Sequence, residues 1–209
     1  MDFRYTEDQL VLAEGVRDYL AGTHGPEVLR RLDATSNRDP AIWQGLVDMG
    51  LPGLLVPEEQ GGMGLGLVDA IPIALECGRA CLAEPLVDTA FVEVPWLKRQ
   101  GDTAALEAIA GGERKAALAH VINPWVADGN GKPLSSIDPL RNLGFAPARS
   151  SADPHLLDLG ALMSAAQLVG LAEAMLAQAV DYAKARPQFG RPIGGFPAGR
   201  ASPTRPGAA

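Results

Sequence analysis

The stretch that decides the fold is Arg186-Pro-Gln-Phe-Gly-Arg-Pro-Ile-Gly-Gly-Phe196, which closes a long apolar segment. That segment, residues 155–185, contains no proline and predicts a single helix about 46 Å long at 1.5 Å per residue. Asp158, Glu173 and Asp181 interrupt it, which argues against a membrane-spanning helix. Its apolar residues cover more than one stripe, as in a bundle helix that needs partners on several sides: Leu156, Leu159, Leu162, Met163, Leu168, Val169, Leu171, Leu176 and Val180.

Residues 1–112, upstream of this helix, carry a series of helix signals. Further helices are expected at 67–81, from Pro85 onward with a kink or an early end at Pro95, and at 102–110. Three helices nearer the N-terminus are marked by local start signals. The first begins with a capping box of Thr6 and Gln9, and the second begins at Pro26. The third begins at the N-cap pair Asp39-Pro40 and stops at Gly50. These residues predict an N-terminal α-helical domain.

Residues 113–153 are interpreted as a shortened β segment. The apolar run from Lys115 to Val126 predicts one strand, and Asp128-Gly-Asn-Gly131 is a strong hairpin turn signal. The return strand is weak, because Pro133 and Asp138-Pro139 are typical of loops. A strand pair alone is marginal in water, so we expect a remnant of a β-domain here.

The composition describes a soluble globular protein of one large domain or two small ones. Of 209 residues, 47% are hydrophobic and 21% are charged, with a formal net charge of −7. The acidic balance argues against nucleic-acid binding, which depends on a basic surface. Met1-Asp-Phe-Arg4 begins no signal peptide, and the two cysteines make no disulfide scaffold. We therefore expect a cytoplasmic protein that spans no membrane.

The sequence contains no general motif of a catalytic or metal-binding site. The glycines of residues 61–66 lack the spacing of the dinucleotide-binding fingerprint. Cys77 and Cys81, four residues apart, are interpreted as two small buried hydrophobic side chains and not as a redox pair. No metal site is expected, because no ligand spacing is met by the three histidines His24, His120 and His155.

Two segments together resemble the acyl-CoA dehydrogenase family. Val56-Pro-Glu-Glu-Gln-Gly-Gly-Met-Gly-Leu65, after a Trp43-x-x-Leu46-x-x-x-Gly50 helix, is similar to the N-terminal helical domain of these enzymes. The opening stretch from Arg186 resembles their R-x-Q-F-G-x-P-I-x-x-F motif. Ala110-Gly-Gly-Glu-Arg114 leads into a strand between the two, and the resemblance covers about residues 1 to 196.

The resemblance implies a mainly α fold and a flavoprotein of lipid metabolism. The expected parts are an acyl-CoA dehydrogenase-like N-terminal helical domain at 1–112, a shortened middle β segment at 113–153, one long helix of an incomplete C-terminal four-helix bundle at 154–196, and a disordered tail at 197–209. In this family a glutamate removes the α-proton of an acyl-CoA thioester while the β-hydrogen leaves as hydride to FAD. A homo- or hetero-oligomer with a related subunit is expected.

The same resemblance implies cofactor-binding residues, namely Arg186, Gln188 and Phe189. In the family these positions contact the pyrophosphate and adenine of FAD bound by a neighbouring subunit. The chemistry is suitable, because a guanidinium pairs with phosphate oxygens and an aromatic ring covers the face of a base. The alternative for Arg186 is a helix-end arginine that satisfies the last backbone carbonyls.

The chain also departs from the family pattern, and we predict no catalytic residue in it. A loop like T-E-P-x-x-G-S-D, which contacts the flavin ring, has no counterpart where Ala119-His-Val-Ile-Asn-Pro-Trp125 stands. One branch of the family places its base near the start of the long helix, where counting back from the motif gives Gly160. Asp158 faces another side of that helix. The composition after Pro197 suggests the hypothesis of a truncated or frameshifted gene product.

Two functional hypotheses follow from these observations. In the first, the chain is an acyl-CoA dehydrogenase by family, an FAD-dependent oxidoreductase of acyl-CoA thioesters, and is inactive alone. In the second, it is a non-catalytic helical subunit that completes the flavin site of a full-length partner. The large apolar surface of the 155–185 helix favours a missing partner under either hypothesis.

Overall fold

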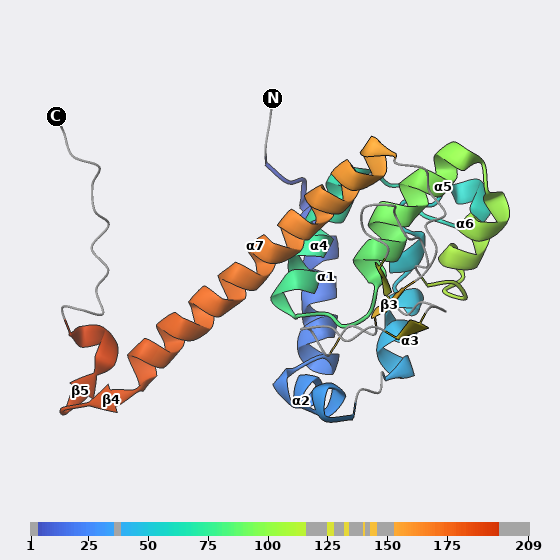
Figure 1. Ribbon diagram of the computed structural model, residues 1–209. Coiled ribbons are helices and arrows are strands. Elements are labelled where there is room, and N and C mark those ends of the chain that lie inside the picture. The colour runs from blue at the N-terminus through green and yellow to red at the C-terminus, as the bar shows by residue number, and fades with distance from the viewer. Residues whose placement is uncertain are drawn as a thin grey trace.

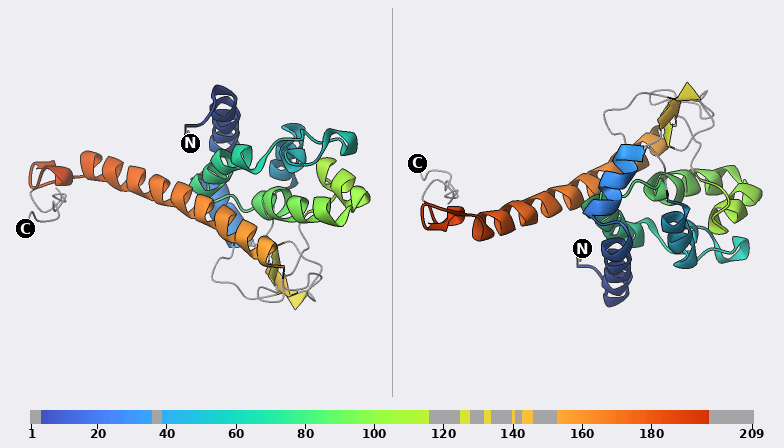
Figure 2. Two further views of the ribbon diagram at one scale, coloured as in Figure 1. Left: turned by 90° about the horizontal axis from the view of Figure 1, so that it is seen from above. Right: turned by 90° about the horizontal axis from the view of Figure 1, so that it is seen from below.

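The structure is a computed structural model that describes residues 4–35, 39–115, 125–127, 132–133, 140, 143–145 and 153–196. A body of short helices is crossed by one long helix, which continues far beyond the body and ends in a small hairpin (Figures 1 and 2). The mainly α fold predicted from the sequence is confirmed. The predicted tail at 197–209 lies outside the described residues, as does most of the predicted middle segment.

The bounds of the helices agree closely with the capping signals of the sequence. Thr6 accepts from the backbone of Gln9 in a capping box, and Asp39 accepts from Ala41 at the start of the third helix. The long helix begins one residue earlier than predicted. The α-helices of the described part are α1 (Glu7–Thr23), α2 (Pro26–Thr35), α3 (Pro40–Asp48), α4 (Leu67–Arg79), α5 (Val94–Gln100), α6 (Thr103–Ala110) and α7 (Pro154–Ala185).

The core of the body lies between α1, α3, α4 and the segments that follow α4. Short 3₁₀ turns at Leu51–Gly53 and Glu58–Gln60 connect α3 to α4, and residues 51–56 are all buried. The largest fully buried apolar side chains come from every part of the body and include Leu20, Leu46, Leu54, Ile73 and Phe91. Burying each of them contributes roughly 1.5–3 kcal/mol to folding.

Pro95 does not end its helix early, which was one of the two outcomes that the sequence predicted. Residues Val87–Glu93 form a π-helical segment that passes directly into α5 at Val94. A proline has no N–H to donate to the preceding turn, and the π-helical segment ahead of Pro95 changes the hydrogen-bond register at the place where that donor is missing. Where we expected an interruption, the helix therefore changes from π-helical to α-helical.

The described strands form a different pairing from the predicted hairpin. The sheet has the order β1 (Trp125–Ala127), β3 (Leu143–Phe145), β2 (Lys132–Pro133), and both outer strands pair antiparallel with β3. The sequence indicated one strand, a strong turn signal and only a weak return strand, whereas the structure has a three-stranded sheet in which the strands on either side of the turn both pair with β3. A turn signal reports only a local reversal, whereas strand partners are chosen by cross-strand packing. The turn itself, residues 128–131, lies outside the described residues.

Helix α7 packs on α4 through its first half only. Leu156, Leu159, Met163, Ala166 and Gly170 are buried there, whereas residues 175–182 are all exposed. By length and composition alone α7 could cross a membrane, although Asp158, Glu173 and Asp181 interrupt its apolar residues as the sequence indicated. A single helix of this kind is weak evidence for a membrane, and its packing on α4 fits a core helix.

The crossing of α4 and α7 is close enough to exclude side chains at two positions. A Cβ added to Gly170 would meet the carbonyl oxygen of Leu75 at 1.9 Å, and one added to Gly78 would meet that of Gln167 at 2.0 Å. The two helix backbones therefore touch directly, each glycine facing the backbone of the other helix. This contact fixes the direction in which α7 leaves the body.

Candidate functional site

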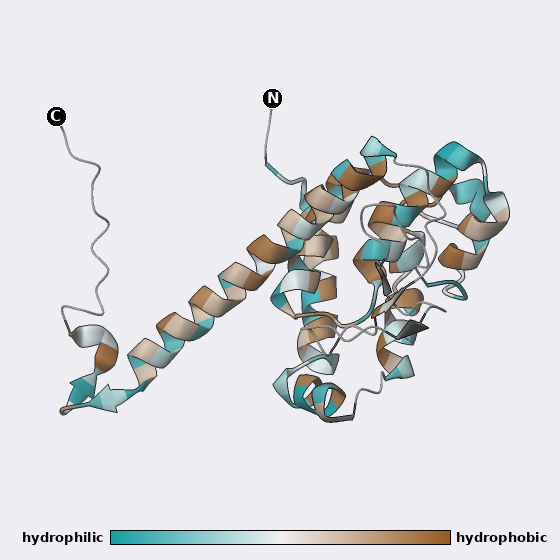
Figure 3. Cartoon of the chain, in the orientation of Figure 1, coloured by the Kyte–Doolittle hydropathy of each residue, from teal (hydrophilic) through white to brown (hydrophobic). Residues whose placement is uncertain are grey.

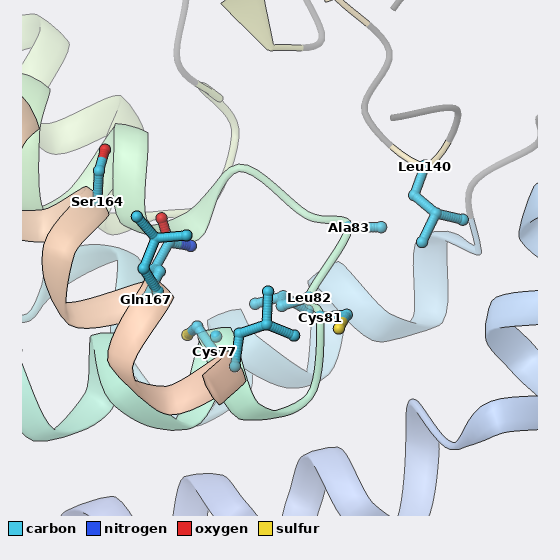
Figure 4. A pocket seen from close by; sticks show the side chains of 10 residues that line it. Cys77, Cys81, Leu82, Ala83, Leu140, Ser164 and Gln167 are labelled. Atoms are coloured by element: carbon cyan, nitrogen blue, oxygen red, sulfur yellow. The ribbon is translucent and has the colours of Figure 1, made fainter. Parts of the chain in front are cut away.

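A cavity of about 440 Å³ lies beside the crossing of α4 and α7 (Figure 4). Its walls are apolar for the most part, and no carboxylate, imidazole or amine is among its described lining residues: Cys77, Gly78, Cys81, Leu82, Ala83, Leu140, Ser164, Gln167, Leu168 and Leu171. The cavity can hold an apolar group and offers the hydroxyl of Ser164 and the amide of Gln167 as polar contacts. It offers no acid or base within the described part of the chain.

The two cysteines that line the cavity differ from each other in burial, and only one of them agrees with the prediction. Cys77 is buried, and burial raises the pKa of its thiol to about 12. Cys81 is exposed and has a positive φ of 52°, because α4 ends at Arg79 and leaves Cys81 in the following turn. The prediction of two buried hydrophobic side chains is therefore right for Cys77 and wrong for Cys81.

Three carboxylates of the body are buried, and each is held by a basic side chain. Glu76 of α4 accepts from Arg17 at 2.9 and 2.7 Å and from Arg79 at 3.1 Å. The ion pair with Glu76 raises the pKa of Arg17. Two further ion pairs fasten the chain after α6 to the body: Arg114 with Glu93 at 2.6 Å, and Lys115 with Glu84 at 2.8 Å.

These ion pairs make the three glutamates structural groups. A charge-assisted hydrogen bond from a guanidinium or an ammonium is about twice as strong as a neutral one, and it fixes the carboxylate in place. None of the three lines the cavity. Sequence reasoning missed them, although the i, i+3 spacing of Glu76 and Arg79 was a signal for one contact of the network.

His24, at the end of α1, is the buried histidine of the described part. Its Nε2 lies 3.3 Å from the carbonyl oxygen of Cys81 and 3.4 Å from the backbone nitrogen of Ala83. Its Nδ1 has no hydrogen-bond partner among the described residues. Burial lowers the pKa of His24, so the ring is neutral and joins α1 to the cavity wall. It matches no metal site, and the described residues contain no cluster that could hold a metal ion.

The motif residues lie at the far end of α7, on a hairpin made by β4 (Pro187–Gln188) and β5 (Arg191–Pro192). The side chains of Arg186, Gln188 and Phe189 are exposed, and Phe189 reaches 86% exposure. Phe196 packs edge-on against Phe189 with ring centres 6.3 Å apart, and the guanidinium of Arg191 lies 4.1 Å from the centre of the Phe196 ring. The hairpin therefore presents an arginine, an amide and an aromatic ring to the outside.

The cavity and the motif are two separate places on one helix. Leu171 of the cavity wall and Arg186 are fifteen residues apart, which is about 22 Å along the helix. Gly160, where the resemblance puts the base of one family branch, has open space around its Cα and brings no side chain to either place. The structure therefore does not bring the motif to the cavity within one chain.

Two family models match the chain on both sides of its middle segment. The model of the N-terminal domain of acyl-CoA dehydrogenases matches residues 6–105, and the model of their C-terminal domain matches residues 153–202. The acyl-CoA dehydrogenase IpdE2 of Mycobacterium tuberculosis is 33% identical, over 92% of this chain and 69% of its own length. The chain belongs to the acyl-CoA dehydrogenase family.

Solved structures of acyl-CoA dehydrogenases share the fold of this chain. The ChsE4–ChsE5 complex from Mycobacterium tuberculosis superimposes with a TM-score of 0.77 and 22% identity, over 95% of this chain and 72% of that one. An acyl-CoA dehydrogenase from Bacillus anthracis complexed with FAD gives a TM-score of 0.72 at 19% identity, over 93% of this chain and 47% of that one. Acyl-CoA dehydrogenases are FAD-binding flavoproteins.

The exposed hairpin fits one part of FAD and leaves another part without a match. Arg186 and Gln188 suit phosphate and adenine edges, and the open face of Phe189 suits a base. In the described part of the chain no loop resembles the one that contacts the flavin ring in the family. The chemistry of the hairpin therefore suits the phosphate and adenine end of FAD.

Proposed function

We propose that the chain is a subunit of an FAD-dependent acyl-CoA dehydrogenase and that it catalyses no dehydrogenation alone. The observation that carries this proposal is the place of the motif, about 22 Å along α7 from the cavity and exposed to solvent. A cofactor-binding motif that points away from its own body is suited to a cofactor held by a neighbouring subunit.

Within the assembly, the chain supplies binding and position. Arg186 would bind the pyrophosphate of FAD, Gln188 would hydrogen-bond the adenine, and Phe189 would cover the adenine face. When bound, FAD accepts the β-hydrogen of an acyl-CoA thioester as hydride. A base of the partner would remove the α-proton, because no carboxylate stands among the described lining residues of the cavity in this chain.

A full-length member of the same family is the partner that fits these requirements. It would bring the flavin-ring loop and the base, which this chain does not offer among its described residues. The likeness to the ChsE4–ChsE5 complex, a complex of two differently named chains, supports an assembly of unequal subunits.

The absorbance spectrum of the purified protein tests the proposal. We expect no flavin bands from the chain alone, and flavin bands with acyl-CoA-dependent dye reduction when it is co-purified with a full-length homologue encoded beside it. Arg186→Gln should lower the flavin content of that complex, whereas Lys184→Gln, two residues earlier, should not. Flavin and turnover in the chain alone would contradict the proposal.

A further inference from the structure

The turn that follows α4 forms one wall of the cavity. Its residues Cys81, Leu82 and Ala83 all line the cavity (Figure 4), and the opposite wall is α7, whose hydrophobic residues follow its whole length (Figure 3). The N–H of Cys81 donates to the carbonyl of Gly78 at 3.0 Å, and the N–H of Leu82 donates to the carbonyl of Cys77 at 2.9 Å. These two hydrogen bonds make a Schellman motif, which closes the helix with one left-handed residue.

Cys81 occupies the place in this motif that glycine usually fills. Its φ is 52°, in the region that the Cβ of an ordinary side chain disfavours. A residue with a side chain adopts this conformation about fivefold less readily than glycine does. The closed form of the turn is therefore strained, and contacts from other parts of the chain have to maintain it.

His24 supplies such contacts from the end of α1, 57 positions away from Cys81. Its Nε2 lies 3.3 Å from the carbonyl oxygen of Cys81 and 3.4 Å from the backbone nitrogen of Ala83. One ring atom therefore reaches both ends of the three-residue turn. Because α1 and α4 are separate helices, the ring also fixes the turn relative to the rest of the body.

A neutral imidazole suits this position and a protonated one does not. A neutral ring donates from Nε2 to Cys81 in one tautomer and accepts at Nε2 from Ala83 in the other. A second proton makes Nε2 a donor only, so the contact with the N–H of Ala83 is lost. It also puts an N–H on Nδ1, which has no hydrogen-bond partner among the described residues. A buried donor without a partner is unfavourable, so protonation opposes the closed turn.

The charges near His24 do not reverse this effect. Glu84, just after the turn, favours the protonated ring, but Lys115 binds its carboxylate at 2.8 Å. The carbonyl end of α1 also favours a cation, and the last turn of α1 contains no charged side chain. Glu27, in the first turn of α2, and the thiol of Cys81 are exposed. Burial outweighs these influences, since the pKa of His24 is lowered.

We propose that His24 is a pH-sensitive switch that keeps the cavity wall closed while its ring is neutral. When the ring takes up a proton, the turn of residues 81–83 opens, the ring reaches water and the cavity loses one wall. The open form binds the proton more tightly, so the closed form is favoured above pH 6.5, the ordinary pKa of histidine, and loses its advantage below it. The inference goes beyond the proposed function, because the switch needs neither flavin nor a partner subunit.

Amide hydrogen exchange of the purified chain at about pH 7.5 and about pH 5.5 tests the switch. The N–H of Leu82 reports on the turn, and the N–H of Leu46, fully buried in α3, reports on unfolding of the whole body. After correction for intrinsic exchange rates, the protection of Leu82 should fall by up to about tenfold at the lower pH, because an exposed imidazole is about nine-tenths protonated there. Low concentrations of denaturant should accelerate exchange at Leu46 and leave Leu82 unchanged, since opening of the turn exposes little surface.

His24→Gln removes the titrating group and keeps an amide that can donate and accept. The protection of Leu82 should then be the same at both pH values, whereas His155→Gln, at an exposed residue, should keep the wild-type change. Cys81→Gly is a second variant, which retains His24. It relieves the strained φ, so it should raise the protection of Leu82 about fivefold at both pH values and preserve the difference between them.

Three results overturn the proposal. In the first, Leu82 and Leu46 exchange at the same rate and with the same response to denaturant, so the turn opens only when the body unfolds. In the second, the protection of Leu82 in the wild-type chain is independent of pH. In the third, the change with pH persists in His24→Gln.

Discussion

Gly170 of α7 lies so close to Leu75 of α4 that a Cβ on the glycine would come within 1.9 Å of the leucine carbonyl oxygen. Gly78 stands in the same relation to Gln167, at 2.0 Å, so the two helices touch through backbone on both sides of the crossing. This backbone contact cannot change without moving a helix.

Gly170→Ala should therefore destabilise the protein, although alanine normally favours a helix. The added methyl group has to push α7 away from α4, and overpacking of this kind costs about 1–3 kcal/mol or more of unfolding free energy. Denaturant unfolding of the purified chain measures it. Gly160→Ala is the control, since the space beside Gly160 is open, and it should stabilise α7 by roughly 0.5–1 kcal/mol. A neutral Gly170→Ala would mean that the crossing is looser than the structure has it.

Glu76→Gln should be among the most damaging single changes in α4. The Glu76 side chain is 5% exposed and joins Arg17 of α1 to Arg79 of α4, whose side chains are 52% and 31% exposed, so its loss leaves two partly solvated cations without their shared anion. Losing charge-assisted hydrogen bonds of this kind costs about 1.5–3 kcal/mol. Glu173→Gln removes an exposed partner of the same Arg79 and should cost less than about 1 kcal/mol. Equal effects in thermal or denaturant unfolding would refute the structural role of Glu76.

His24 should make the stability of the protein depend on pH in a defined window. Burial lowers the pKa of His24 below its ordinary value of 6.5, so the unfolded chain takes up a proton more readily than the folded one. Stability is therefore full above pH 6.5 and falls as the pH drops below it, until the folded form is protonated as well. His24→Gln should flatten this part of the curve, whereas His155→Gln, at an exposed residue, should preserve it. Identical pH curves for the three proteins would contradict the assignment.

The two cysteines should differ sharply in reactivity. Cys77 is fully buried with its pKa raised to about 12, and the thiolate is the form that reacts, so alkylation at neutral pH should spare it. Cys81 is exposed and should be alkylated in the native protein. Mass spectrometry of tryptic peptides distinguishes the sites, and denaturant should make both react. The Cys81→Ser chain should show no native labelling at all.

The sequence predicted those parts of the fold that depend on neighbouring residues. Thr6 and Asp39 mark helix starts because a side-chain oxygen satisfies a free backbone N–H two or three positions on, and that geometry is local. The long helix was predicted to within one residue, because its apolar residues recur over its whole length. The exposed motif residues Arg186, Gln188 and Phe189 came from the family resemblance, and their contact with FAD stays a prediction.

Features that depend on distant parts of the chain could not be predicted in the same way. Glu76 and Arg17 are 59 positions apart, and nothing in either segment announces the other. The pairing of β1 and β2 with β3 is likewise a choice among distant partners. An early helix end was predicted at Pro95, and it is absent because the preceding residues are π-helical. Propensities for ordinary α-helices do not describe that register. Tertiary packing decides each of these cases.

The close contact at Gly170 also determines where the far end of α7 lies, because the helix projects from this crossing as one rigid element. The helix continues for sixteen residues from there to Arg186, a length of about 24 Å. A change of about 10° in the crossing angle would sweep the hairpin through about 4 Å, which is more than the length of a hydrogen bond. The position of Arg186 therefore depends on the absence of a side chain at Gly170, about 24 Å away along the helix.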